Sequence, residues 1–195
     1  MNKLVINIYG SPGAGKSTLA KNLKKYMREK RIDVGLISEF ATELIENNQK
    51  ERLKDQPYVT KGQMLNIAKV LKEHDIAISD SPIELGKFYC DPKDKKRTNE
   101  LIKKCKNFYT SINFFLKLDK QAKQDYTMES RVHTYTQSQK LQERMLASSI
   151  LRDETFMIID RNTQIKEVLK MIEKSKQWKE HQNQSKGLEL WTKTQ

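Results

Sequence analysis

The sequence predicts an α/β fold in which a five-stranded parallel sheet lies between two layers of helices. Short apolar runs, typical of buried strands, alternate along the chain with longer segments that have the periodicity of amphipathic helices. A glycine-rich loop follows the first apolar run and precedes the first amphipathic segment. The 195 residues contain no internal repeat or low-complexity linker, so we expect one domain over residues 1–178 and a polar tail over residues 179–195.

The five predicted strands are short and largely apolar, as strands are when both faces of a sheet are covered. They lie at residues 4–9, 33–38, 76–79, 112–118 and 156–159. Ligands of such a sheet bind at the carboxyl ends of its strands. The residues that follow the strands are therefore the site candidates: residues 10–17, Glu39, Asp80, Asp119 and Asp160.

Helices are predicted over residues 16–31, 40–48, 63–75, 138–151 and 163–178, and a basic helical segment ends near residue 107. In the first helix, apolar side chains such as Leu19, Leu23 and Met27 recur on one face, and lysines lie mostly on the other. The stretch RLKDQPYVTKG, residues 52–62, is expected to be a loop. The tail has few apolar residues, so we expect it to be mobile or to dock on a partner.

The glycine-rich loop GSPGAGKS, residues 10–17, has the spacing G-x-x-x-x-G-K-[ST] of a Walker A loop. Glycines let backbone N–H groups converge on phosphate oxygens, and the helix that follows adds its positive end. Lys16 is expected to reach the β- and γ-phosphates of a nucleotide, and Ser17 to hold Mg²⁺. The predicted nucleotide-binding residues are Gly10, Ser11, Pro12, Gly13, Ala14, Gly15, Lys16, Ser17 and Thr18.

Two carboxylates follow predicted strands and are candidates for catalysis. Asp80 is placed to orient the Mg²⁺ shell or to accept a proton, although an Asp before Ser-Pro also suits a simple turn. Glu39 could take the proton of a hydroxyl acceptor, or could serve only as a favourable charge at a helix N-terminus.

Neighbouring residues argue against two classes of phosphate-loop protein. Motors that hydrolyse ATP usually have a glutamate directly after the Asp, where this chain has Ser81. Small GTPase switches need glycine at the fourth position of D-x-x-G, which is Ile83 here. Their guanine-reading motif needs Asn or Thr where LKLD has Leu116.

A polar segment rich in hydroxyl side chains follows the fourth strand, at about residues 119–137. Such a segment is typical of a lid that closes over phosphates and brings an arginine to the developing charge. Arg131 is the first candidate for that arginine and Arg144 the second, and the alternative for each is a solvated side chain.

The formal net charge is +12, which favours a polyanionic partner or reflects a surface rich in lysine. Residues 93–106 include seven basic residues and two acidic ones. This stretch could be a solvated helix face, or it could bind the phosphates of a nucleotide or DNA. Phe88, Tyr89 and Tyr109 flank this stretch and could stack on bases or pack in the core.

The cysteine content and the hydropathy bear on location. Cys90 and Cys105 lack metal or redox spacing and are expected to be reduced thiols of a cytoplasmic protein. No apolar run approaches the roughly 20 residues of a membrane-spanning helix, so we expect no membrane association.

The segments GSPGAGKST, LISEFATELI, ISDSPIELGKFY and FFLKLDKQAKQDYTMESR resemble a family of small P-loop kinases common in bacterial viruses. The family is similar to the kinase domain that acts on nicotinamide riboside and, more distantly, to deoxynucleoside and thymidylate kinases. Its viral members include kinases of 5-hydroxymethyluracil in DNA. The resemblance covers roughly residues 3–175 and implies a P-loop kinase-like three-layer sandwich with a lid.

The resemblance implies an ATP- and Mg²⁺-dependent kinase that phosphorylates a hydroxyl of a nucleotide-type acceptor. It maps the Walker A loop onto residues 10–18, the post-strand glutamate onto Glu39, the D-S-P motif onto Asp80–Pro82 and the lid arginine onto Arg131, although Ser130 stands where related sequences tend to have glycine. The metal ligands would be Ser17 and Asp80.

The first acceptor that we expect is 5-hydroxymethyluracil in DNA, in the host cytoplasm if the chain is viral. A free nucleoside, nucleotide or riboside is the alternative, and a nucleotide-dependent DNA-binding module is a third possibility. The oligomeric state is left open.

Overall fold

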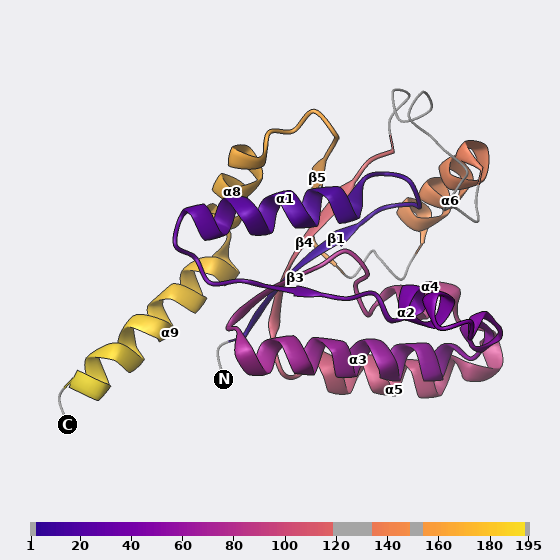
Figure 1. The fold of residues 1–195 in the computed structure, drawn as a ribbon, viewed down its shortest axis with the longest axis horizontal. Coiled ribbons are helices and arrows are strands. Elements are labelled where there is room, and N and C mark those ends of the chain that lie inside the picture. The colour runs from indigo at the N-terminus through magenta and orange to yellow at the C-terminus, as the bar shows by residue number, and fades with distance from the viewer. Residues whose placement is uncertain (1–2, 119–133, 149–153, 194–195) are drawn as a thin grey trace.

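The computed structural model describes residues 3–118, 134–148 and 154–193 (Figure 1). Most of the predicted lid, with Asp119 and Arg131, lies outside these residues. The strands are β1 (Leu4–Tyr9), β2 (Gly35–Ile37), β3 (Ile76–Ser79), β4 (Thr110–Leu116) and β5 (Phe156–Ile159). The helices are α1 (Lys16–Glu29), α2 (Phe40–Glu46), η1 (Lys50–Lys54), α3 (Gln56–Glu73), α4 (Leu85–Tyr89), η2 (Pro92–Asp94), α5 (Lys95–Lys106), α6 (Tyr135–Ala147), α8 (Ile165–Lys174) and α9 (Lys176–Lys193).

The five strands form one parallel sheet in the order β2-β3-β1-β4-β5, which confirms the predicted fold class. Helices α1 and α8 cover one face, and α3 and α5 cover the other (Figure 1). The core on the first face joins alternate residues of β1, such as Ile6 and Ile8, to Leu23 and Met27 of α1. The sheet is thus buried on both sides, as its continuous apolar strands require.

Helix α3 begins at Gln56, earlier than the sequence indicates, so the expected loop at residues 52–62 is partly wrong. The side chain of Asp55 caps the helix by accepting a hydrogen bond of 3.0 Å from the Tyr58 N–H. Pro57 lies in the first turn, where its missing N–H would have had no helical partner. The early start adds two turns to the N-terminal end of this helix.

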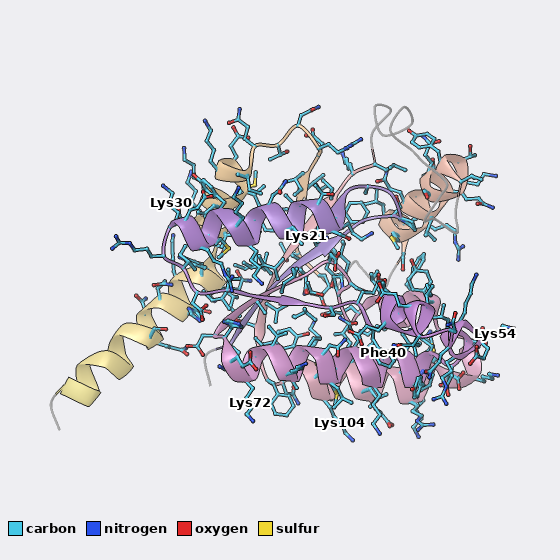
Figure 2. The ribbon with its side chains drawn as sticks, viewed as in Figure 1. Lys21, Lys30, Phe40, Lys54, Lys72 and Lys104 are labelled. Carbon is cyan, nitrogen blue, oxygen red and sulfur yellow. The ribbon has the colours of Figure 1, made fainter. Side chains whose placement is uncertain are left out.

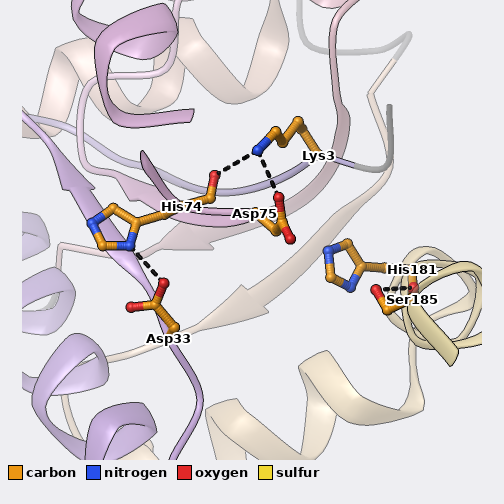
Figure 3. Close-up of polar contacts among 6 residues, drawn as sticks. All are labelled: Lys3, Asp33, His74, Asp75, His181 and Ser185. Atoms are coloured by element: carbon orange, nitrogen blue, oxygen red, sulfur yellow. Dashed lines mark hydrogen bonds and ion pairs between the residues drawn. The ribbon is translucent and has the colours of Figure 1, made fainter. Parts of the chain in front are cut away.

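The expected polar tail forms a helix instead, and α9 extends away from the sheet toward the C-terminus (Figure 1). Trp178 and His181 at its start are buried, and their rings stack with centroids 6.3 Å apart. The opposite end of the sheet from the glycine-rich loop is fixed by polar contacts (Figure 3). Lys3 Nζ donates to Asp75 Oδ1 at 2.6 Å, and His74 Nδ1 lies 2.8 Å from Asp33 Oδ2.

In the part of the chain that the structure describes, no helix has the length and hydrophobicity that would let it span a membrane. Lysines lie on several parts of the surface, and Figure 2 shows examples at α1, η1, α3 and α5. These lysines therefore lie on both helical layers, and basic residues are not confined to residues 93–106.

Candidate functional site

The glycine-rich loop connects the buried end of β1 to the first turn of α1. Three of its glycines have positive φ angles, at 145° for Gly10, 80° for Gly13 and 98° for Gly15. Gly10 is also required by space, because a Cβ there would lie 2.5 Å from the Leu116 carbonyl oxygen. With no acidic residue in the first turn of α1, this loop and helix end form a concave, electropositive anion site.

Lys16 lies inside this loop, and its Nζ donates to the Ser11 carbonyl oxygen at 3.1 Å. Burial lowers the pKa of Lys16, and the charges of Glu39 and Asp80 partly oppose that shift. A bound phosphate would supply the close negative charge that favours the ammonium form.

The loop opens onto a cavity of about 650 Å³. Gly10, Pro12, Gly13, Lys16 and Ser17 of the loop form one wall of it. Beyond them the cavity is lined by Glu39, Asp80, Ser81, residues of α3 and Tyr89 of α4. Its volume lies within the roughly 300–1,000 Å³ of small-molecule sites, so it has room for more than phosphate groups.

Glu39 and Asp80 reach this cavity from the ends of neighbouring strands. Glu39 follows β2 as the N-cap residue of α2, and its carboxylate accepts a hydrogen bond of 2.7 Å from the Thr42 hydroxyl. Asp80 directly follows β3 and is half-buried. The structure thus brings three of the four predicted catalytic residues to one cavity, and the fourth, Arg131, lies outside the described residues.

The proposed metal ligands, Ser17 and Asp80, line the same cavity. Among the described residues, no group of three or more His, Cys, Asp or Glu side chains could hold a metal. This donor set fits Mg²⁺, which commonly takes one or two protein oxygens and completes its shell with water and substrate phosphates.

Tyr89 of α4 also lines the cavity and is 49% exposed. Burial of part of its ring and the charge of Glu39 raise the pKa of Tyr89 to about 12, and the guanidinium of Arg144 opposes the shift. Arg144 lies over the Phe88 ring, 5.4 Å from its centroid. Of the two predicted arginines, Arg144 is thus the one that the structure places near the cavity. Tyr109, which was a candidate for stacking on bases, is buried in the core.

A second hollow of about 270 Å³ lies on the α8 side of the glycine-rich loop. Three other loop residues, Ala14, Gly15 and Thr18, line it together with Asp160 and Arg161. The Asp160 carboxylate accepts the Thr163 N–H at 3.0 Å and so also orders the loop that leads to α8. Residues of the glycine-rich loop thus line two separate hollows.

Three residues of α3 were not predicted as part of the site. Gln56, Thr60 and Gln63 are buried and line the main cavity. Gln56 and Thr60 lie in the stretch that the sequence predicts to be a loop, so the spacing of the three residues on one helix face, by four and then three residues, was not apparent. The capping Asp55 before Pro57 was the signal that could have revealed it.

The parallel sheet, the phosphate-binding loop and the carboxylates at the neighbouring strand ends define a P-loop nucleotide-binding protein. Residues 5–167 match the family described as AAA domain, and the chain belongs to that family.

Among solved structures, the fold is similar to one titled "Crystal structure of NadR protein in complex with NR". The TM-score is 0.57 at 16% sequence identity, and the match covers 83% of this chain and 47% of that chain. The matched region is thus about half of the NadR chain, and the likeness is one of fold. A search of the curated proteins gave no match.

Proposed function

We propose that this protein is an ATP- and Mg²⁺-dependent kinase that transfers the γ-phosphoryl group to a hydroxyl of a nucleotide-type acceptor. The observation that carries the proposal is the cavity of about 650 Å³ that adjoins Lys16, Glu39 and Asp80. A protein that only hydrolyses ATP needs room for water beside the γ-phosphate. This space instead suits an organic acceptor, and Ser81 replaces the glutamate expected of a hydrolytic motor.

The residues have distinct roles in this proposal. Lys16 and the backbone N–H groups of the loop bind the phosphate oxygens and neutralise the charge that develops during transfer. Mg²⁺, held by Ser17 and Asp80 with phosphate oxygens and water, would add further charge neutralisation when bound. Nucleotide binding on the α8 side of the loop would leave the main cavity for the acceptor.

Glu39 is the better placed of the two carboxylates to act as the base. Its charge affects the pKa of both Lys16 and Tyr89, so Glu39 lies near the phosphate loop and also near Tyr89. Asp80 affects the pKa of Lys16 and directly follows β3, which lies between β2 and the central strand β1. In the transfer, the acceptor oxygen forms a bond to the γ-phosphorus, the bond to the β,γ-bridging oxygen breaks, and the acceptor proton passes to Glu39.

The leading acceptor is a hydroxymethylated pyrimidine, 5-hydroxymethyluracil, in DNA. The net charge of +12 supports a polyanionic acceptor, and the base would have to leave the DNA stack to enter the cavity. A free riboside is the second candidate, because the similar NadR structure is titled as a complex with NR. Arg131 remains the proposed lid arginine, and Arg144 is a second source of positive charge at the cavity edge.

The test is transfer from γ-labelled ATP with Mg²⁺ to separate pools of nucleosides, nucleotides, nicotinamide riboside, plain DNA and DNA containing 5-hydroxymethyluracil. We expect stable label in an acceptor that has a free hydroxyl, and loss of that label in Lys16→Ala. Lys21→Ala is the matched control, because Lys21 is an exposed lysine on the same helix. Label in small molecules only would overturn the proposal that DNA is the acceptor. Label in no pool would overturn the proposal that the protein is a kinase.

A further inference from the structure

The buried polar side chains of α3 form a row, defined here as Gln56, Thr60 and Gln63, at the acceptor end of the main cavity. They recur at intervals of four and three residues, so they share one face of the helix. Their exposed fractions are 9%, 2% and 5%. Polar groups buried this deeply need hydrogen-bond partners.

The orientation of the Gln63 amide is fixed by a hydrogen bond from the backbone of α2. The Phe40 N–H donates to Gln63 Oε1 at 2.9 Å, and a backbone N–H cannot accept a hydrogen bond. The oxygen must therefore face Phe40, which leaves Nε2 as the group that can donate elsewhere. Nε2 is buried and has no hydrogen-bond partner among the described residues.

Gly62 allows this arrangement by letting α2 approach α3. A Cβ at Gly62 would lie 2.2 Å from the Phe40 ring, so any larger residue would push Phe40 and its N–H away from Gln63. Phe40 is labelled in Figure 2, beside α3. The amide donor is thus held by the packing of two helices.

Thr60 repeats the pattern one turn earlier on the helix. Its Oγ1 is buried and has no hydrogen-bond partner within the described residues. It faces Gly86, another residue of the cavity wall, where a Cβ would lie 2.7 Å from Oγ1. A hydroxyl both donates and accepts, so Thr60 is suited to an N–H that lies beside a carbonyl.

The row carries no charge, and the charged residues that line the cavity in the described chain are Lys16, Glu39 and Asp80. Leu53, Val59, Ile83 and Leu85 provide apolar walls around the row, and Tyr89 provides an aromatic one. Such a space fits the edge of a flat ring better than it fits a phosphate or a sugar.

We propose that the row on α3 recognises an uncharged amide edge, a carbonyl oxygen beside an N–H, on the ring of the acceptor. The carbonyl accepts from Gln63 Nε2 and the N–H donates to Thr60 Oγ1. A uracil-type base carries this edge within its ring, and a nicotinamide ring carries it as a carboxamide. Cytosine places an amino group where uracil has the carbonyl. This proposal rests on the proposed function, because it takes the main cavity as the acceptor site.

The test measures binding to the full chain by calorimetry, with thymidine, deoxycytidine and nicotinamide riboside as free ligands. Oligonucleotides with 5-hydroxymethyluracil or 5-hydroxymethylcytosine carry the same comparison into DNA. Ligands with the amide edge should bind at least about tenfold more tightly than their cytosine counterparts, because a mismatched edge leaves buried donors unpaired. Equal binding of the two bases would overturn the proposal. Which ligand binds, whether nucleoside, nicotinamide riboside or oligonucleotide, identifies the molecule that carries the amide edge.

Two variants separate recognition from folding. Gln63→Glu keeps an acceptor for the Phe40 N–H but removes the Nε2 donor, so it should weaken binding of the amide edge at least about tenfold. ATP affinity should stay unchanged. Gln184→Glu on α9 is the control, with the same change of charge at an exposed position. Unchanged binding in Gln63→Glu would overturn the proposal.

Thr60→Val covers the case in which Gln63→Glu does not fold. Removing a buried hydroxyl that lacks a partner should leave the thermal midpoint of the free protein equal or higher, while binding of the amide edge weakens. A lower midpoint with unchanged binding would contradict recognition by Thr60. If phosphate transfer occurs but does not depend on Gln63 and Thr60, the kinase proposal holds and recognition by this row is wrong. If binding depends on these two residues but no transfer occurs, recognition holds and the kinase proposal is wrong.

Discussion

Lys16 has an electrostatic environment that suits a bound ligand better than a free site. Burial lowers the pKa of Lys16, although Glu39 and Asp80 lie near enough to oppose the shift. A lowered pKa means that the folded chain holds this proton less tightly than the unfolded chain does, so at neutral pH the charged lysine reduces the stability of the free protein. The negative charge of a triphosphate would reverse that effect.

We therefore expect Lys16→Met to separate function from stability. Phosphate transfer should fall by about 10²-fold or more, because a main stabiliser of the transferred group is lost. The thermal midpoint without nucleotide should be equal to or higher than that of the wild type, and ATP should raise only the wild-type midpoint. Scanning calorimetry with and without ATP measures the thermal midpoints, and transfer of label from γ-labelled ATP measures the activity. A variant that remains active would show that the donor site lies elsewhere.

At the scale of elements, the start of α3 decides how much of the cavity wall exists. Asp55 holds the first turn through the Tyr58 N–H, and this turn carries Gln56 and leads to Thr60. The N-terminal turn of a helix has unpaired N–H groups, so a lost cap affects both stability and the position of these side chains.

Asp55→Ala should lower the free energy of unfolding by about 1 kcal/mol, the usual value of an N-cap. It should also weaken acceptor binding, because the turn that carries Gln56 would fray. Urea unfolding and ligand titration measure the two effects. The control is Asp91→Ala, because Asp91 is also an N-cap residue but its side chain makes no cap hydrogen bond. If both variants behave alike, the cap at Asp55 has no special role.

Some of these elements and site residues could be predicted from the sequence, and others could not. Lys16, Glu39 and Asp80 were predictable because the ends of parallel strands meet at one edge of a sheet and the Walker A spacing is specific. Gln56 and Thr60 were not, because the residues around Pro57 suit a turn as well as a first helical turn. The helix at α9 was missed because its polar composition gives no signal, and the burial of Trp178 depends on tertiary packing.

At the scale of the molecule, a buried polar network connects the sheet to the cavity walls. Lys106 of α5 pairs with Glu84 at 3.0 Å and also with Glu154. Glu84 is 1% exposed, and its other oxygen accepts from the Tyr9 hydroxyl at 3.0 Å. Tyr9 precedes the glycine-rich loop and Glu84 precedes α4, so the network fixes both walls relative to each other.

Lys106→Met should lower the free energy of unfolding by about 3 kcal/mol, because it leaves a buried carboxylate without its cation. Burial lowers the pKa of Lys106, but Glu84 and Glu154 outweigh this and the pKa is raised. The stabilisation is therefore complete below pH 10.5, the ordinary value, and is lost as the pH rises through the value in the folded protein. Urea midpoints should differ most between variant and wild type below pH 10.5 and should converge as the pH rises through the pKa of Lys106 in the folded protein.

Lys104→Met is the control for this prediction, since Lys104 is an exposed lysine on the same helix (Figure 2). Surface lysines contribute little to stability, so we expect a change within about 0.5 kcal/mol. A loss in Lys104→Met as large as that in Lys106→Met would show that general charge, and not the network, accounts for the effect.

In the proposed reaction, the γ-phosphoryl group passes to an alcohol in the main cavity and not to water. The most direct measurement is a single-turnover reaction with γ-labelled ATP and the acceptor that binds best, in which label in the phosphate ester is compared with label in inorganic phosphate. We expect the phosphate ester to hold most of the label and Lys16→Ala to abolish its formation. Release of most of the label as inorganic phosphate, whether or not the acceptor is present, would contradict transfer to an alcohol.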